Sequence, residues 1–263
     1  METRNCENDF GFFVIIILCN LSKKFMANLF SYVLRIDDGA APNPFWKVCT
    51  LTICKPKIRK GAQKGDWIVG TGSKCYRFKD GKVKDLSRYL VYAMKVDKVL
   101  SLEKYDSYCQ VNLKNKIPDF SKNRYERKIG DCIYKFENGK IIVREGVHTG
   151  DEKQNKADIN GKNSLLSWQF YYFGDKAIKI PHTLRGMIKK GRAHKKIQDE
   201  AFIKEFESWI TKNGELNKLV GEPIHKYYFD EGDKTCKVKC NKRETKKDLE
   251  GKEEIIKKLK PIC

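Results

Sequence analysis

The feature that most constrains the fold is a series of short apolar runs, rich in aromatic and β-branched residues, which turn-forming residues separate. Side chains of these kinds suit the pleated, half-buried surface of a sheet, so the runs predict β-strands. The expected strands cover residues 29–36, 47–53, 67–71, 89–100 and 165–173. Because strands outnumber helical patterns and hairpins recur, we predict an α+β fold. Its sheet would be curved or barrel-like, mixed or antiparallel, with flanking helices, rather than doubly wound and parallel.

Local signals predict two hairpins and one capped helix. The pairs Asp80-Gly81 and Asn138-Gly139 each lie between strand-like segments. Asp-Gly and Asn-Gly readily adopt the positive φ angles of a type I′ turn, so each pair predicts a two-residue hairpin turn. Ser101 opens a capping-box pattern, which predicts a short helix directly after it.

A second helix is predicted from an amphipathic pattern between residues 199 and 211. Phe202, Phe206, Trp209 and Ile210 recur there at a spacing that places them on one face. After residue 213 the chain becomes rich in Lys and Glu, with weak apolar spacing, which favours a solvated tail over a second domain. We therefore expect one domain over residues 26–213 and a Lys-rich tail over 214–263.

The N-terminal segment contains an apolar run at residues 10–19. The run is shorter than the roughly 20 apolar residues that span a bilayer. It also lacks the features of a signal peptide, because acidic residues precede it, Lys23 and Lys24 follow it, and no small-residue cleavage site is present. Met26 opens directly on a strand-like pattern, so we favour it as the natural start, with residues 1–25 as an extension. No membrane association is expected.

The chain is strongly basic, with 54 Lys and Arg against 34 Asp and Glu, a formal charge of +20. Such a charge attracts polyanions, nucleic acid first. However, only 11 of the 54 basic residues are Arg, the side chain that forms bidentate contacts with phosphates and base edges. A Lys-, Asn- and Ile-rich composition is also typical of AT-rich genomes, so charge alone does not assign a partner.

The ten cysteines are scattered through strand-like runs rather than clustered in loops. This distribution favours reduced thiols in a cytoplasm over a disulfide framework. The only possible metal cluster is Cys236, Cys240 and Cys263, with His225 as an optional fourth member, and no cysteine pair has the C-x2-C spacing of structural zinc sites. We therefore predict no metal site.

The stretch at residues 54–74 first has to be tested as a phosphate-binding loop, because Gly65 and Gly70 have the required spacing. A phosphate-binding loop continues with Lys and then Ser or Thr, whereas Thr71 and Gly72 stand there, and the intervening residues are strand-like. That function is excluded. Glycines at the end of this strand would instead let a ligand approach the backbone and the hydroxyls of Thr71 and Ser73, although a simple tight turn explains them equally well.

No catalytic constellation is recognisable from local sequence. The candidate nucleophiles and bases are Cys49, Cys54, His148, His182, His194 and His225. None lies in a nucleophile elbow or triad motif, and the adjacent carboxylates at 37–38 would point apart on a strand end. Cys54 is a small buried hydrophobe in one interpretation and a thiolate activated by neighbouring Lys55 or Arg59 in the other.

Aromatic and basic residues interleave between positions 44 and 92. The rings that could stack on a base are Phe45, Trp46, Trp67, Tyr76 and Tyr92. Lys55, Arg59 and Lys74 could then contact phosphates. The competing interpretation places Trp67 and Tyr92 in the core.

The succession FSYVLRIDDGAAPNPFWKVCTLTICKPKIRKGAQKGDWIVGTGSK, then YLVYAMKV and later FYYFG, resembles the second type of the nucleotide-modification-associated domains of phages and bacteria, which occur beside DNA-base-modification genes. The resemblance covers residues 29–174, with a weaker continuation to Trp209. At the level of fold, the basic stretch before an apolar strand is also similar to PUA-, ASCH- and EVE-type barrels that hold a modified base. The family resemblance implies a role around modified nucleobases in a bacterial or phage-infected cell, with partners in a base-modification system, and leaves the mechanism and any cofactor open.

Two functions are therefore compared. In the first, a non-catalytic module binds nucleic acid, DNA rather than RNA, or a nucleotide, and holds a base in a pocket beside a basic strand. The predicted binding residues are Arg35, Asn43, Lys55, Lys57, Arg59, Thr71, Ser73, Lys74 and Tyr92. In the alternative, an enzyme of nucleotide or DNA-base modification uses the same pocket, with Arg35, Asp66, Tyr92 or Cys54 near the chemistry. The missing acid/base pattern favours the first.

Overall fold

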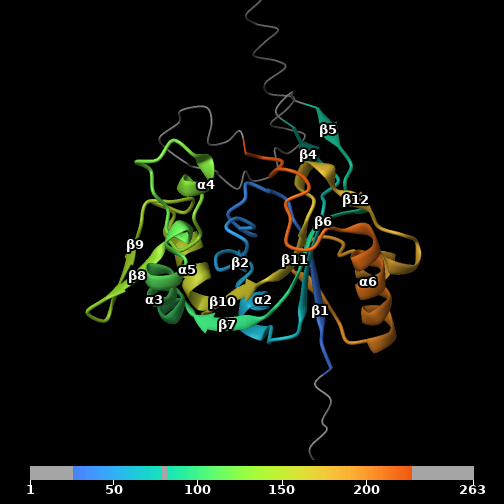
Figure 1. Ribbon diagram of the computed structural model, residues 1–263, viewed down its shortest axis with the longest axis horizontal. Helices are drawn as coiled ribbons and strands as arrows, with labels where there is room; N and C mark the ends of the chain where they lie inside the picture. The colour runs from blue at the N-terminus through green and yellow to red at the C-terminus, as the bar shows by residue number, and fades with distance from the viewer. Residues whose placement is uncertain (1–25, 79–81, 227–263) are drawn as a thin grey trace, which may run out of the picture.

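The computed structural model describes residues 26–78 and 82–226, and within these residues the largest sheet has six strands (Figure 1). They are β1 (Leu29–Val33), β3 (Trp67–Thr71), β6 (Tyr89–Lys95), β11 (Gln169–Tyr172), β12 (Ile178–Lys179) and β13 (His194–Ile197). The strand order is β11-β6-β3-β1-β13, with β12 also paired to β6. β1 and β3 run parallel, and the other pairs of this sheet are antiparallel.

Three smaller sheets complete the strands. The three-stranded sheet has the order β2-β10-β7, and the two others are hairpins. Their strands are β2 (Cys49–Leu51), β10 (Asn163–Ser167), β7 (Lys98–Ser101), β4 (Tyr76–Arg77), β5 (Val83–Lys84), β8 (Tyr134–Glu137) and β9 (Lys140–Val143).

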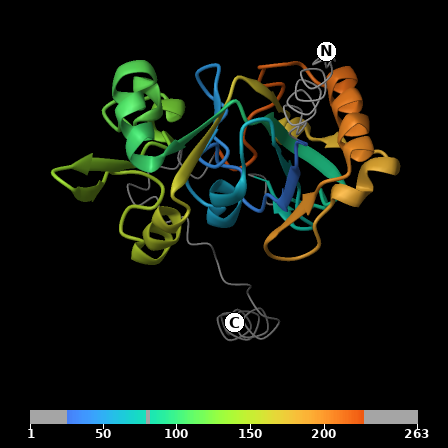
Figure 2. The same ribbon diagram turned by 90° about the horizontal axis from the view of Figure 1, so that it is seen from below.

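Five α-helices occur in the described part of the chain, and three short 3-10 helices accompany them. The α-helices are α2 (Pro56–Gly61), α3 (Leu102–Asn112), α4 (Tyr125–Lys128), α5 (Glu152–Asn160) and α6 (Glu200–Asn213). The 3-10 helices are Lys114–Lys116, Gly174–Lys176 and Thr183–Met187. Helix α6 covers one side of the large sheet, whereas α3, α4 and α5 lie at the opposite end of the molecule beyond the three-stranded sheet (Figures 1 and 2).

Both faces of the large sheet are buried, and alternation along its strands explains why. On β1, Leu29 belongs to the apolar cluster under α6, whereas Phe30 belongs to the cluster shared with the three-stranded sheet. On β3, Val69 belongs to the cluster under α6 and Ile68 to the cluster shared with the three-stranded sheet, because successive side chains of a strand point to opposite faces. Trp67 lies in the cluster under α6, with only 5% of its surface exposed. The core interpretation of Trp67 is therefore confirmed.

Two runs predicted as single strands are each divided between two sheets. Residues 89–100 form β6 in the large sheet and β7 in the small one, and residues 165–173 form β10 and β11. Both runs break at the same corner, where the Asp97 carboxylate accepts hydrogen bonds from Trp168 N at 2.6 Å and Gln169 Nε2 at 2.8 Å. Asp is unfavourable in strands, and the hydrogen bonds of its carboxylate hold the two segments together where both pass from one sheet to the other. The prediction of two uninterrupted strands was wrong.

Three of the remaining local predictions agree with the structure, and the Asp80-Gly81 turn lies outside the described residues. Asn138 and Gly139 have φ angles of 49° and 72° between β8 and β9, as a type I′ turn requires. β4 pairs with β5 around residues 79–81, which lie outside the described ranges together with residues 1–25 and 227–263. Ser101 caps α3 by accepting Lys104 N at 3.1 Å, and α6 buries Phe206 and Ile210 on the predicted face.

The basic stretch at residues 54–74 differs from its prediction in two respects. Residues 56–61 form helix α2 and not a strand, because Pro56 occupies the first helical turn, where its missing N–H costs nothing. The glycines at the end of β3 are not open to a ligand, since a Cβ on Gly70 would lie 2.4 Å from Tyr92 Cε1 and one on Gly72 would lie 2.4 Å from Leu86 O. These glycines let the protein pack against itself.

The fold class is α+β, with sheets of mixed strand orientation. The strand path of the large sheet has free ends at β11 and β13, so among the described residues it is not a closed barrel, and the PUA-like similarity is not confirmed. Residues 214–226 also pack on the domain, since Asn217 N donates to Phe170 O and His225 N donates to Asp37 O. In residues 26–78 and 82–226, no helix has the length and apolar content needed to cross a bilayer.

Replacing Gly70 with Ala tests the close packing at the end of β3. The added methyl group would overlap the buried Tyr92 ring, so we expect the free energy of unfolding to fall by about 1–3 kcal/mol, measured by urea denaturation. Gly61→Ala is the matched control, because no atom outside its own helix and its chain neighbours lies within 4 Å of its Cβ position. Equal stability of the two variants would contradict the packing argument.

Candidate active site

Cys54 lies in a strained turn between β2 and α2. Its φ angle is 58°, and that of Lys55 is 43°, so two consecutive side-chain-bearing residues adopt the left-handed conformation. Such backbone is unfavourable and persists only where surrounding contacts fix it. Here the Cys54 N–H donates to Asp158 Oδ1 at 2.5 Å, and the Cys54 carbonyl accepts Arg59 Nε at 2.7 Å. The turn leaves the Cys54 residue half-buried rather than in the core.

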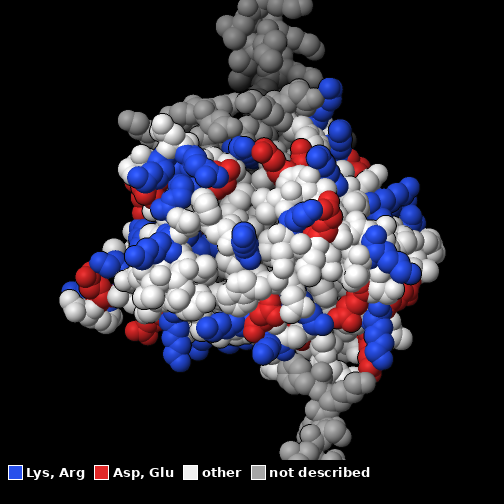
Figure 3. Space-filling view, in the orientation of Figure 1, with Lys and Arg blue, Asp and Glu red and all other residues white. Residues whose placement is uncertain are grey.

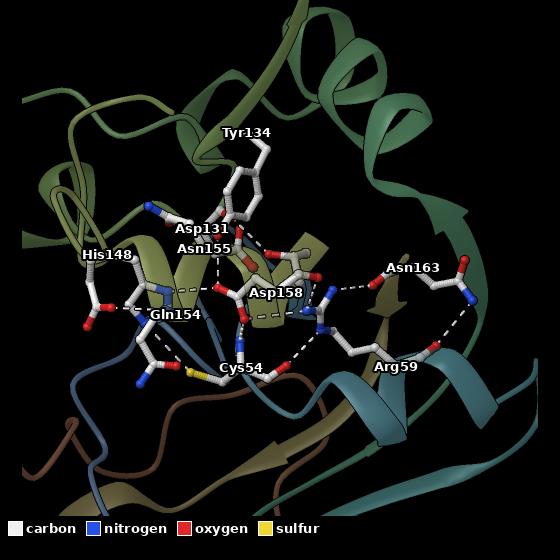
Figure 4. A network of polar contacts seen from close by, with 11 residues as sticks. Cys54, Arg59, Asp131, Tyr134, His148, Gln154, Asn155, Asp158 and Asn163 are labelled. Atoms are coloured by element: carbon white, nitrogen blue, oxygen red, sulfur yellow. Dashed lines mark hydrogen bonds and ion pairs between the residues drawn. The ribbon is translucent and has the colours of Figure 1, made fainter. Parts of the chain in front are cut away.

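His148 comes from the segment between β9 and α5 and reaches the same turn (Figure 4). Its Nε2 lies 3.8 Å from Cys54 Sγ, within hydrogen-bonding range of sulfur, and its Nδ1 lies 2.7 Å from Asp158 Oδ2. The Nδ1 contact fixes the ring orientation and directs Nε2 at the sulfur. The side chain of His148 is 14% exposed and that of Asp158 is fully buried. A thiol, an imidazole and a carboxylate are therefore aligned as a nucleophile–base–orienting triad.

Asp158, on the last turn of α5, is the centre of this network (Figure 4). Its Oδ2 accepts the Tyr134 hydroxyl at 3.0 Å as well as His148, and its Oδ1 accepts the Cys54 N–H and is 3.5 Å from Arg59 Nη2. Every acceptor direction of the buried carboxylate thus has a donor. This satisfaction is what allows an ionised group to remain in the interior.

Arg59, on α2, fastens the segments that carry the triad. Besides the Cys54 carbonyl, its guanidinium donates to Asn163 O at 2.8 Å and to Asp158 O at 2.6 Å. It is completely buried, and burial lowers its pKa while the Asp158 charge opposes that effect. Gly161 permits this position, because a Cβ there would lie 2.4 Å from Arg59 Nη2. One side chain therefore joins the turn at Cys54 to residues 158–163, which are distant in sequence.

The electrostatics of the site favour a charged imidazole. Burial alone would lower the pKa of His148, but its hydrogen bonds to Asp158 and to Cys54 outweigh burial and raise the pKa to about 11. His148 is consequently an imidazolium at neutral pH, with one N–H directed at a carboxylate and the other at sulfur. An imidazolium beside a cysteine sulfur is the arrangement in which thiol nucleophiles are activated.

The predicted binding residues occupy three kinds of position. Asn43, Thr71 and Tyr92 are buried and hydrogen-bonded inside the protein, as Arg59 is. Arg35, Lys57 and Lys74 are exposed, and Lys55 and Ser73 are half-buried. Lys55 Nζ lies 4.6 Å from the centre of the Tyr32 ring. The exposed residues are thus available to a polyanion. Phosphate contacts by the buried residues remain a prediction, which their burial does not favour.

Of the residues named for the enzyme alternative, only Cys54 belongs to the triad. Asp66 is buried as a turn-stabilising acid, with Oδ1 accepting Asn28 N at 2.7 Å and Oδ2 accepting Gln63 N at 2.8 Å. Sequence reasoning considered His148 as one of four histidines and did not identify Asp158. Among the described residues, no group of three or more His, Cys, Asp and Glu side chains is arranged to hold a metal ion. Cys236, Cys240 and Cys263 lie outside those residues.

Comparison with known families extends this description. The family model for nucleotide modification associated domain 2 matches residues 26–230. The chain belongs to this family. No curated protein and no solved structure matches this chain. The Nmad2 domain includes all three members of the triad, from Cys54 to Asp158, and connects the protein with modified nucleotides.

Asp158→Asn tests the source of the His148 charge. Loss of the carboxylate leaves burial opposed only by Cys54, so we expect the pKa of His148 to fall by several units, measured by NMR titration of the ring. Asp151→Asn, at the N-cap of the same helix, should leave that pKa unchanged, because Asn also accepts the Gln154 N–H. An unaltered His148 pKa in Asp158→Asn would refute the assignment of Asp158 as the orienting group.

Asp37 offers a separate test through the pH dependence of stability. It is buried, accepts the Tyr172 hydroxyl at 2.6 Å, and burial raises its pKa to about 7 despite that hydrogen bond. Because the unfolded carboxyl ionises near pH 4 and the folded one near pH 7, stability should fall between these values as pH rises. Relative to the natural protein, Asp37→Asn should therefore be more stable at pH 8 than at pH 4, by on the order of a few kcal/mol in urea denaturation. A constant difference across that range would disprove the shift.

Proposed function

We propose that this Nmad2 protein is a thiol enzyme that modifies a nucleobase or nucleotide. Cys54 Sγ is the nucleophile, His148 transfers protons, and Asp158 orients and stabilises the imidazolium. The observation that carries the proposal is the continuous line from Cys54 Sγ through the His148 ring to the buried Asp158 carboxylate. Family membership supports a nucleobase or nucleotide as the substrate class.

The proposed chemistry is covalent. In this cycle Cys54 reacts as the thiolate: Sγ forms a bond to an electrophilic substrate carbon while His148 Nε2 gives its proton to the atom that receives the displaced electron pair. A second nucleophile then breaks the carbon–sulfur bond, and His148 takes up the proton of that nucleophile. The arrangement supports this cycle because the ring is held by Asp158 and both Cys54 and His148 are partly open to solvent.

Non-catalytic binding of nucleic acid is the second candidate. The net charge of +20 and the exposure of Arg35, Lys57 and Lys74 favour it. It would allow a modified base to be recognised without conversion, with DNA preferred to RNA. The sequence suggested a pocket beside a basic strand. Because that basic segment forms helix α2, the pocket would have to lie beside the helix instead.

Selective alkylation distinguishes the two candidates. At pH 6, iodoacetamide should modify Cys54 about tenfold faster than Cys75, as followed by peptide mass spectrometry, because the His148 ring lies 3.8 Å from the Cys54 sulfur and can assist its reaction. Cys75 is an internal control, since it is a free and exposed cysteine. His148→Asn should remove the difference.

A substrate screen completes this test. Cys54→Ser should abolish any mass change that the natural protein produces in nucleotides or DNA. If Cys54 reacts no faster than Cys75 and no nucleotide is altered, the thiol-enzyme proposal fails and the binding function becomes the better explanation.

A further inference from the structure

We infer that a cavity beside α4 binds a planar nucleobase. The cavity has a volume of about 340 Å³, within the range of small-molecule sites. Its aromatic wall is formed by Phe45, Trp46 and Tyr125, and residues 219–223 line it as well. That the bound base is also the group that reacts rests on the proposed function. Binding itself does not require Cys54.

The aromatic wall is rigid and suited to stacking. The rings of Phe45 and Tyr125 meet edge to face, with centroids 5.5 Å apart and an interplanar angle of 86°. Gly39 permits this packing, since a Cβ there would lie 2.8 Å from Tyr125 Oη and 2.9 Å from Phe45 Cε2. Arg124 lies over the Trp46 ring at 5.5 Å, which adds a flat cation to the same wall. Aromatic and guanidinium planes are the surfaces on which bases stack in single-stranded nucleic acids.

Two donors of this wall have unused hydrogen-bonding capacity. Trp46 Nε1 and the Tyr125 hydroxyl are buried and have no partner among residues 26–78 and 82–226. Tyr125 is 7% exposed, so solvent reaches little of it. A buried donor without an acceptor is unfavourable, and a heterocycle with carbonyl or ring-nitrogen acceptors could provide one.

The rim is polar but nearly balanced in charge. Arg124 pairs with Glu126 at 3.3 Å, and Lys176 and Asp175 lie on the 3-10 turn opposite. Cations and carboxylates side by side do not favour a polyphosphate, whereas base edges carry both donors and acceptors. Lys and Arg side chains gather over α4 at the upper left of Figure 3, next to an uncharged surface, which suits a base whose backbone stays outside.

One apolar cluster extends from the cavity wall to residues next to the triad. The cluster contains Phe45 and Tyr125, together with Ile53, which precedes Cys54, and Val147, which precedes His148. Tyr134, which donates to Asp158, belongs to the same cluster. A ligand in the cavity would therefore contact Phe45 and Tyr125, which belong to the same cluster as the sequence neighbours of the thiol and the imidazole.

Binding is tested with the full chain carrying Cys54→Ala, so that no turnover occurs. The probes are free deoxynucleosides, short single-stranded DNA, and the same DNA with one abasic site, each titrated by calorimetry. Trp46→Leu should weaken binding about tenfold or more, because it removes a stacking surface. Trp168→Leu is the matched control, since this tryptophan is 37% exposed at the sheet corner and outside the cavity.

The outcomes separate the ligand sources and the two proposals. Binding of nucleosides indicates that the ligand is a free nucleotide, and binding of intact DNA alone indicates that it is a DNA strand. In either case Trp46→Leu should weaken the binding. Equal affinities for intact and abasic DNA, or equal effects of the two tryptophan variants, overturn the inference. If Trp46→Leu does not fold, Tyr125→Phe keeps the ring, removes one donor, and should still weaken binding severalfold. Base binding without preferential Cys54 alkylation would refute only the thiol enzyme, and the reverse result would refute only this cavity.

Discussion

The buried carboxylate of Asp158 is the constraint on which the site depends. A buried ion pair stabilises a protein only when its remaining hydrogen bonds are satisfied, because both charges lose their hydration. Arg59 meets this condition by donating to three backbone carbonyls, and Asp158 by accepting from a backbone amide, a phenol and an imidazole. The same carboxylate thus holds α2 to α5 and orients His148, so the structural and the chemical roles of Asp158 cannot be separated completely.

The sheets explain why this carboxylate meets Cys54. β2, which leads to Cys54, pairs with β10, which follows α5, so the two ends of the site are fixed to neighbouring strands. The corner at Asp97 and Trp168 then carries the chain from this small sheet into the large one. Because the large sheet is covered on both faces, the small sheet has a rigid support. A strained turn at Cys54 is tolerated where the surrounding framework is fixed on several sides.

Features with local signals could be predicted from sequence, and features made by distant contacts could not. The Asn138-Gly139 turn, β3 and the face of α6 each follow from a few neighbouring residues. Cys54 could be named as a candidate because of its basic neighbours, but His148 and Asp158 lie 94 and 104 positions further along the chain. Arg59 shows the opposite error. In a run of lysines it resembles a solvent-exposed phosphate ligand, and only its contacts with residues 158–163 reveal that it is buried.

The charges of the buried site bear on the reaction that we propose for it. Arg59 and His148 are cationic and Asp158 is anionic, so these three groups together carry a net positive charge in a largely buried setting. Such a charge is unfavourable unless an anion compensates it, and the side chain placed next to the imidazolium is a thiol. Either the Cys54 sulfur or a bound substrate can supply that negative charge. Both possibilities place electron density beside His148 Nε2, where a covalent reaction with a nucleotide would begin.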